Sequence, residues 1–398
     1  MSGRFNLYSP EVWSNPYPFY AELRRTNPVC QIEPGGLWAV TRYDDVLHVL
    51  KNPQLFSSEG LRAATQPAWL DKRNPISDSI LVMDPPNHTR LRALVTRAFG
   101  PAGMARLEPF IRSLSESLTT QVMEPREVDF MQAFALPLPA GVLGQLLGLD
   151  LSLASRFKRW ADDMVNIGTT SPENTAQQAR LRATLDEMEG YVNEVVEKRR
   201  REPGDDLVSD LLRARVDGEA LTQGELMGFL FLLLVAGLET TMNLLGICAL
   251  TLADHPDVMQ RLRADNALIP RFIEEVLRHE SPSQATMRVT TAETELGGVR
   301  LPAGSVLMVL KGSANRDETY FPEPDRFDMD RSNTRSLVFG HGIHFCLGAQ
   351  LARLEARIAL ETLLARCGRL EREPGPVQWG LAVTTRGPAV LPVVAHPA

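Results

Sequence analysis

Apolar residues recur every three or four positions along most of the chain, the spacing that predicts amphipathic α-helices. Strand patterns are fewer: Trp38–Thr41 predicts one strand, and the stretch 286–311, with two glycine-containing turns, predicts a small antiparallel sheet. The valine-rich tail 383–394 is broken by two prolines, so we expect a short edge pairing there at most. The predicted helices cover about 16–26, 43–51, 88–99, 104–122, 178–201, 223–253, 256–263, 270–279 and 347–367.

This pattern predicts a mainly α protein with a minor β region (α+β), in a single domain that spans 1–398. No internal repeat, low-complexity linker or clear seam divides the chain. Its composition, 44% hydrophobic and 23% charged, is that of a globular protein with a large core. Thr222 followed three positions later by Glu225 resembles a capping box and predicts the start of the long apolar helix.

Charge and hydropathy argue against two classes of partner. A formal net charge of -7 does not suit a non-specific nucleic-acid binder or a surface that adheres to anionic lipid. The uncharged run Leu226–Leu238 is shorter than the roughly 18 residues of a membrane span, and Glu239 separates it from the next apolar residues. We therefore expect a buried core helix, no membrane and no nucleic acid.

Cysteine usage and the N-terminus indicate a cytoplasmic protein. The four cysteines are scattered, without a Cys-x-x-Cys pair, which does not describe a disulfide scaffold. The first residues contain no apolar stretch of the kind that a secretion signal needs. The cysteines are Cys30, Cys248, Cys346 and Cys367.

The stretch Phe339–Gly348 contains the strongest chemical signal. Cys346 lies between glycines, immediately before a predicted helix, where backbone N–H groups and the helix dipole favour a thiolate. Such a thiolate serves as a metal ligand or a nucleophile. From these residues alone two alternatives stay open: a buried cysteine in a glycine-rich turn, and a zinc site with His341 and His344.

Phe339, Gly342, Cys346 and Gly348 match the cysteine-loop signature of the cytochrome P450 superfamily, and the chain resembles its soluble bacterial members. The resemblance implies the cytochrome P450 fold and a haem b (iron protoporphyrin IX) whose iron is bound axially by the Cys346 thiolate. It also implies that Phe339, Gly340, His344 and Gly348 lie against this cofactor. The implied enzyme is a haem-thiolate monooxygenase, of a kind used in secondary metabolism.

The motif Ala236-Gly237-Leu238-Glu239-Thr240-Thr241 lies within the long apolar helix. On its residues alone it is a helix kink with a polar pair, because glycine is costly in a helix and Thr240 can bond to a carbonyl four residues back. It resembles the family's oxygen-binding motif. The resemblance implies that Glu239 and Thr240 deliver protons during oxygen activation and that Ala236 and Gly237 leave room for the oxygen.

Two further sets of residues match the family. Glu275 and Arg278 form its Glu-x-x-Arg motif, and Arg326, within Pro324-Asp325-Arg326-Phe327, is implied to join them in a buried structural network that supports the cysteine loop. The family also implies four partners for the two haem propionates, since fixed donors suit carboxylates. They are His88, Arg92, Arg288 and His344.

The resemblance implies insertion of one oxygen atom of O₂ into a mainly hydrophobic small molecule. Pocket positions also fall in the loop about 57–80 and the segment about 160–175. No flavin or nicotinamide motif is present, so we expect electrons from a separate ferredoxin or flavodoxin with an NAD(P)H-dependent reductase. The implied pocket side chains are Leu232, Leu233, Ala236, Ala285, Thr286, Val383 and Thr384.

A local basic patch of Arg90, Arg97, Arg353 and Arg357 is expected to receive that electron donor, and a monomer is the family default. Three other functions stay open: a peroxide-using peroxygenase, a non-catalytic haem carrier or gas sensor, and a zinc-bound or metal-free helical protein. The sequence does not identify the substrate, its regioselectivity or the native redox partner.

Overall fold

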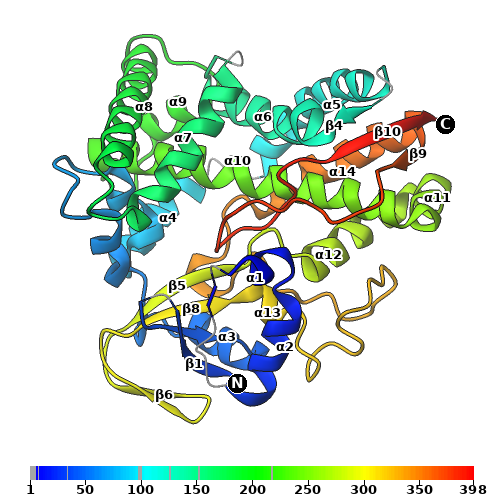
Figure 1. Ribbon diagram of the computed structural model, residues 1–398. Helices are drawn as coiled ribbons and strands as arrows, with labels where there is room; N and C mark the ends of the chain where they lie inside the picture. Colours follow the sequence, from blue (N-terminus) through cyan, green and yellow to red (C-terminus); the bar gives the residue numbers. More distant parts are fainter. Residues whose placement is uncertain are drawn as a thin grey trace. The chain divides into compact units, whose positions relative to one another are not determined.

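The computed structural model describes residues 6–7, 9–33, 35–96, 101–124, 127–150, 153–216 and 218–398, and its contacts divide the chain into two compact units (Figure 1). The mixed unit comprises Met1–Phe56, Ile111–Leu138 and Thr240–Ala398. The helical unit comprises Ser57–Phe110 and Pro139–Glu239. The predicted mainly α class with a minor β region is confirmed, and the single domain stays a prediction.

The main sheet of the mixed unit joins strands from distant parts of the chain. Its order is β1-β2-β8-β5-β3, with β2 parallel to β8, while β1 with β2 and β5 with β8 are antiparallel. The predicted strand near residue 38 and the predicted sheet within 286–311 are both present; in the second, the hairpin β6–β7 forms a separate two-stranded sheet. The bounds are β1 Val29–Ile32, β2 Leu37–Val40, β3 Phe56–Ser57, β5 Ala285–Thr290, β6 Thr294–Leu296, β7 Val299–Leu301 and β8 Val306–Leu310.

The C-terminal tail differs from its prediction. β10 (Pro392–Pro397) is the middle strand of a second sheet, between β4 (Val128–Asp129) and β9 (Cys367–Glu371), so the prediction of an edge pairing at most was wrong. Pro392 and Pro397 lie at the two ends of the strand; its first two residues pair with β4 and the other four with β9. Figure 1 shows β9 and β10 side by side.

Helices cover the sheets of the mixed unit. One apolar core lies between the main sheet and α3, where Val46, Phe56 and Leu307 are fully buried. The bounds are α1 Pro10–Ser14, α2 Tyr17–Thr26, α3 Tyr43–Lys51, α11 Pro256–Ala264, α12 Ile269–His279, α13 Lys311–Ala314 and α14 Ala349–Arg366, with the π-helix η5 Met131–Ala135 and the 3₁₀ helices η8 Asn266–Leu268 and η9 Gly342–His344.

Three helices, α5 (Pro101–Met123), α6 (Pro137–Leu147) and α10 (Gln223–Asp254), contribute residues to both units. The predicted capping box of α10 is confirmed, because the Thr222 N–H donates to the Glu225 carboxylate (2.8 Å) and the Glu225 N–H donates to the Thr222 hydroxyl (3.2 Å). By length and composition α10 could cross a membrane, but 61% of its most apolar window is buried within the protein. This burial fits a core helix.

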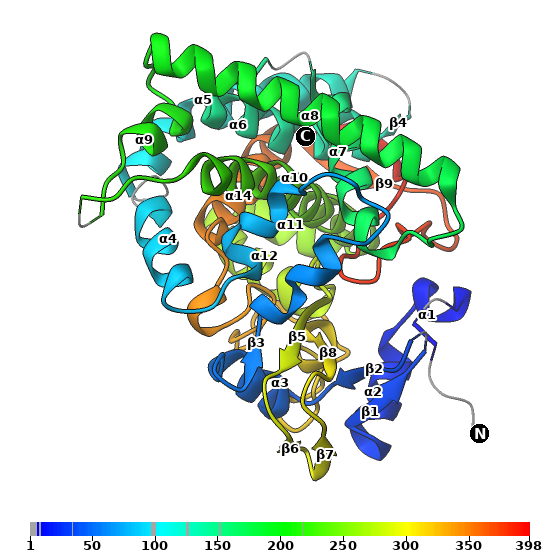
Figure 2. The same cartoon turned by 90° about the vertical axis from the view of Figure 1, so that its left-hand side faces the viewer.

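The helical unit is built around α7 (Ala154–Asn166) and α8 (Thr175–Arg201), which lie side by side (Figure 2). Trp160 of α7 is fully buried against Tyr191 of α8, with ring centroids 5.6 Å apart. The sequence pattern did not predict α6, α7 or α9. The remaining bounds are α4 Asn87–Thr96 and α9 Leu207–Arg213, with the 3₁₀ helices η1 Glu59–Thr65, η2 Pro75–Asp78, η3 Ile80–Val82 and η7 Ile167–Thr169.

Candidate functional site

The segment 337–346, here called the cysteine loop, leads into α14 and ends at the one exposed cysteine of the chain. The Cys346 N–H donates to the Phe339 carbonyl (2.9 Å), which closes the loop on itself. Cys248 and Cys367 are buried, and burial raises the pKa of both thiols. Cys30 is half-buried, so Cys346 is the most accessible of the four thiols.

Glycines shape the two sides of this loop differently. Gly342 has φ +71°, and a Cβ there would lie 2.6 Å from the Leu50 carbonyl oxygen at the end of α3, so no other residue fits. Beside Gly348, by contrast, a Cβ would meet no heavy atom within 4 Å. The loop is thus packed against α3 on one side and has open space next to the cysteine.

A buried ion pair connects α12 to the cysteine loop. The Arg278 guanidinium binds the Glu275 carboxylate through two bonds of 2.8 and 2.7 Å, and both side chains are at most 1% exposed. Arg278 also donates to the Asn315 carbonyl (3.0 Å), and the Asn315 side-chain oxygen accepts from the Leu337 N–H (2.6 Å). The Glu-x-x-Arg pair thereby reaches the first residue of the loop through one asparagine.

The predicted buried position of the Arg326 guanidinium is wrong. This side chain is 59% exposed and pairs with Asp328, while only its backbone carbonyl accepts from Arg278 (3.2 Å). The second cation at Glu275 is Arg331, 7% exposed, with 3.4 Å between Nε and the carboxylate oxygen. Because the Arg326 carbonyl faces the buried pair, the Arg326 side chain points toward solvent.

Sequence reasoning missed Arg331, Asn315 and Lys311. Asn315 and Lys311 hold neighbouring positions of the loop, since Lys311 Nζ donates to the Val338 carbonyl (2.9 Å). The residues around Asn315 resemble a stretch of bacterial family members, but the resemblance implied no role for them. The sequence did contain a usable signal. Lys311 and Asn315 closely follow the apolar strand β8, and polar residues at the end of a buried strand are often buried with it.

The middle of α10 differs from its flanks. Residues 226–231 and 241–250 are buried, whereas Leu232, Leu233, Gly237, Glu239 and Thr240 are half-buried and Ala236 is exposed. A Cβ at Gly237 would lie 3.1 Å from Leu143 of α6, so close packing explains the glycine. The predicted oxygen-side motif therefore coincides with the accessible stretch of a largely buried helix.

The four predicted propionate partners lie in three elements, α4, β5 and η9. His88 is buried and Arg92 half-buried, one turn apart on α4 of the helical unit. In the mixed unit, Arg288 is buried on β5 and donates to the Met287 carbonyl (2.6 Å), and His344 is half-buried in η9.

The predicted pocket segments of the mixed unit are adjacent but not on one face. The Thr384 carbonyl accepts from the Gln284 and Ala285 N–H groups (2.8 and 3.2 Å), which places the turn beside β5. Thr286 shares a face with Arg288, since the arginine donates to its hydroxyl (3.3 Å). Side chains alternate along a strand, so Ala285 points the other way, into a core cluster on which Val383 also packs. Ala285 and Thr286 therefore face opposite sides of β5.

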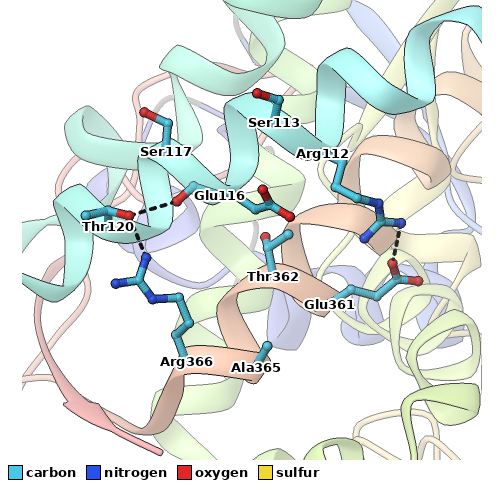
Figure 3. A pocket seen from close by; sticks show the side chains of 9 residues that line it. All are labelled: Arg112, Ser113, Glu116, Ser117, Thr120, Glu361, Thr362, Ala365 and Arg366. Carbon is cyan, nitrogen blue, oxygen red and sulfur yellow. Dashed lines mark hydrogen bonds and ion pairs between the residues drawn. The ribbon is translucent and has the colours of Figure 1, made fainter.

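One surface pocket of the mixed unit, of about 560 Å³, lies between α5 and α14 (Figure 3). It includes none of the predicted site residues. It lies near Thr362, thirteen residues along α14 from Ala349, or about 20 Å at the helical rise per residue. The pocket is lined by Arg112, Ser113, Glu116, Ser117, Thr120, Glu361, Thr362, Ala365 and Arg366.

Two sequence hypotheses lose support. Among the described residues no group of three or more His, Cys, Asp or Glu side chains could hold a metal ion, so a zinc site lacks its ligands. The expected basic patch is largely paired with acids: Arg90 with Glu225, Arg357 with Glu361 (2.7 Å), and Arg353 with Glu274 (2.5 Å). Arg353 also lies 4.4 Å over the Phe339 ring. Arg97 lies outside the described residues.

Comparisons with known proteins agree on one family. The family model described as cytochrome P450 matches residues 151–376. The vitamin D(3) 25-hydroxylase of Pseudonocardia autotrophica is 37% identical over 98% of this chain and 96% of its own. A cytochrome P450 structure from Chondromyces apiculatus has a TM-score of 0.90 and 44% identity over 99% of this chain and 98% of its own. A myxobacterial cytochrome P450 in complex with myristic acid has a TM-score of 0.90 and 38% identity over 98% of both chains.

Proposed function

This chain belongs to the cytochrome P450 family and is a haem-thiolate monooxygenase, and from that premise we propose that it inserts one oxygen atom of O₂ into a mainly hydrophobic small molecule with haem b as cofactor. The observation that carries the proposal is the cysteine loop. Its one accessible thiol lies beside open space and is held by a buried network. A flat cofactor with one axial thiolate fits this donor set.

In this proposal Cys346 Sγ binds the haem iron, and Phe339, Gly340 and Gly348 lie against the porphyrin. The bound haem supplies oxygen activation and hydrogen abstraction, which protein side chains cannot perform. The chain orients the cofactor through its propionates, which accept from fixed cationic and imidazole donors. These donors are His88, Arg92, Arg288 and His344.

Proton delivery belongs to Glu239 and Thr240 in the accessible stretch of α10. The Thr240 hydroxyl holds a proton within reach of the oxygen site, and the Glu239 carboxyl resupplies it, a task for a positioned acid near a hydroxyl. Ala236 and Gly237 carry no bulky side chain, which leaves space beside the helix for the oxygen. Thr240→Ala should therefore separate NAD(P)H consumption from product formation, with more peroxide released per NAD(P)H.

The substrate proposal rests on the character of the proposed pocket positions. Leu232, Leu233 and Val383 are apolar and incompletely buried, and Thr286 and Thr384 add two hydroxyls. Mostly apolar walls with a few polar groups suit a hydrophobic molecule with one or two polar atoms. The relatives named for vitamin D(3) and solved with myristic acid make these two compounds the first probes.

Electrons come, in this proposal, from a separate ferredoxin or flavodoxin that an NAD(P)H-dependent reductase reduces. The protein acts as a monomer in the cytoplasm. Because the described arginines of the expected patch are paired with acids, we expect the reduction rate to fall only modestly with salt.

The test is a reduced, carbon-monoxide-bound spectrum of the haem-loaded protein and of Cys346→Ala. We expect the strongly red-shifted Soret band of a thiolate–carbonyl adduct in the unmutated protein alone. The band in Cys346→Ala, or its absence from the unmutated protein, contradicts the proposal. Spin-shift titrations with vitamin D(3), myristic acid and a polar sugar as control then test the substrate class.

A peroxygenase or a haem carrier would give the same spectrum, and turnover distinguishes them. Product that forms with NAD(P)H, ferredoxin and reductase, and that falls at least tenfold in Thr240→Ala, supports the monooxygenase. A peroxygenase would form product from peroxide equally well with and without the Thr240 hydroxyl. A carrier or sensor would form no product under either condition.

A further inference from the structure

Lys311 is a buried cation without a carboxylate partner. Its side chain is 6% exposed, and Nζ donates to the Ser283 hydroxyl (2.6 Å) and the Val338 carbonyl (2.9 Å), both neutral groups. Within the described part of the chain no Asp or Glu lies in ion-pair distance of it. Burying an unpaired ammonium is costly, and a methionine would fill the same space without that cost. Stability alone therefore does not account for a lysine here.

The ammonium is connected to Cys346 through the backbone of the cysteine loop. Val338, which accepts from Lys311, precedes Phe339, whose carbonyl accepts from the Cys346 N–H (2.9 Å). Burial lowers the pKa of Lys311 to about 8, and the negative charge of a Cys346 thiolate acts in the opposite direction. Lys311 thus stays cationic at neutral pH.

We propose that Lys311 is a positioning residue whose buried charge holds the cysteine loop and sets the electrostatic potential at the proposed iron–thiolate bond. The inference rests on the proposed haem-thiolate function. One electron delivered by the redox partner would lower the net charge of the bound haem–thiolate site by one, with no bond or proton changed. A fixed cation behind the loop favours the more negative state, so it makes reduction easier.

The expected size follows from Coulomb's law in a protein interior. For an assumed separation of roughly 10 Å and an effective dielectric constant near 20, a unit charge changes a one-electron equilibrium by about tenfold or somewhat more. Tenfold corresponds to about 59 mV for one electron. The effect should resist salt, because a buried charge is screened far less than a surface charge.

The test is a spectroelectrochemical titration of the haem-loaded full chain and its Lys311→Met variant. We expect the midpoint potential to fall by about 59 mV in Lys311→Met, equivalent to a tenfold weaker reduction. Lys51→Met is the matched control: it removes the same charge from the exposed last residue of α3, which also packs beside the loop at Gly342, and it should leave the potential unchanged.

Should Lys311→Met not load haem, Lys311→Gln carries the same expectation, since it keeps an N–H donor for the Val338 carbonyl and loses the charge. A wild-type potential in either variant overturns the role of Lys311 while the thiolate–carbonyl band persists. Absence of that band from the unmutated protein overturns the proposed function and this inference with it. A lowered potential in each Lys311 variant that loads haem, with an unchanged potential in Lys51→Met, supports the role of the charge.

Discussion

The cysteine loop of the mixed unit and the segment 59–82 of the helical unit are held in opposite ways. The loop is supported by Arg278 and Glu275, which are 0% and 1% exposed. The segment is attached to α8 by Lys72, 29% exposed, which binds Asp186 and Glu189 at 65% and 36% exposure. We call this second attachment the α8 clasp.

The difference matches the roles proposed for the two regions, cofactor binding for the loop and substrate recognition for the segment. A buried pair cannot lose one member without stranding a charge, so the loop tolerates little change, as a fixed cofactor ligand requires. Exposed ion pairs contribute little and can be exchanged cheaply, which suits a segment proposed to adapt to different substrates. The same contrast explains why the loop was recognisable from its residues and the segment was not.

The largest effect is expected at the centre of the buried network. Arg278→Ala leaves the Glu275 carboxylate buried with a weaker partner and removes the bond to Asn315, so we expect a loss of about 3–5 kcal/mol in the free energy of unfolding. Chemical denaturation measures it. Arg261→Ala, which breaks an exposed pair with Asp330, is the control and should cost less than about 1 kcal/mol. Equal losses of stability in the two variants would show that the buried and the exposed pair contribute alike.

Arg331 and Arg326 provide a matched pair from one segment. Arg331→Ala removes a buried cation from Glu275 and donors from three carbonyls, and we expect a loss of about 1.5–3 kcal/mol. Arg326→Ala removes an exposed side chain and should change stability by no more than about 0.5 kcal/mol. The reverse order in denaturation experiments would favour the sequence prediction for Arg326 over the structure.

Glu355 of α14 is buried, and its Oε2 has no hydrogen-bond partner. Burial raises the pKa of its carboxyl to about 8. The folded state then holds the proton more tightly than the unfolded state, in which the ordinary pKa of 4.5 applies. The contribution of this group to stability is full below pH 4.5 and is lost as pH rises toward 8.

Glu355→Gln should therefore gain stability relative to the unmutated protein by up to about 1.4 kcal/mol per pH unit across this window. Denaturation at pH 5, 6, 7 and 8 measures the difference. Parallel pH profiles for the two proteins would show that the carboxyl is ionised in the folded state.

The smallest effect is expected at the α8 clasp. Lys72→Met removes two exposed pairs, and we expect a loss of about 0.2–1 kcal/mol that disappears at high salt. Lys198→Met, which removes an exposed charge elsewhere on α8, is the control. A loss above about 2 kcal/mol in the free energy of unfolding that persists in roughly 1 M salt would show that the α8 clasp contributes as much as a buried pair. It would contradict the difference between the two regions.

Local patterns determined much of the helical framework and singled out the cysteine that we propose as the haem ligand. Helical spacing located α2, α3, α10, α12 and α14 to within a few residues, because each buries one apolar face whatever its neighbours are. The capping box at Thr222 and the loop glycines were readable for the same reason, since their geometry is a property of a few consecutive residues.

Only the tertiary structure decided which arginine enters the Glu275 network, that Asn315 and Lys311 hold the loop, and that the tail is a central strand. Each depends on groups brought together from distant positions, and burial there follows from where the backbone runs and not from the residue type. Arg326 and Arg331 are chemically identical. The Arg326 carbonyl faces the buried pair, so the Arg326 side chain points into solvent, and the Arg331 side chain neutralises the buried Glu275 carboxylate.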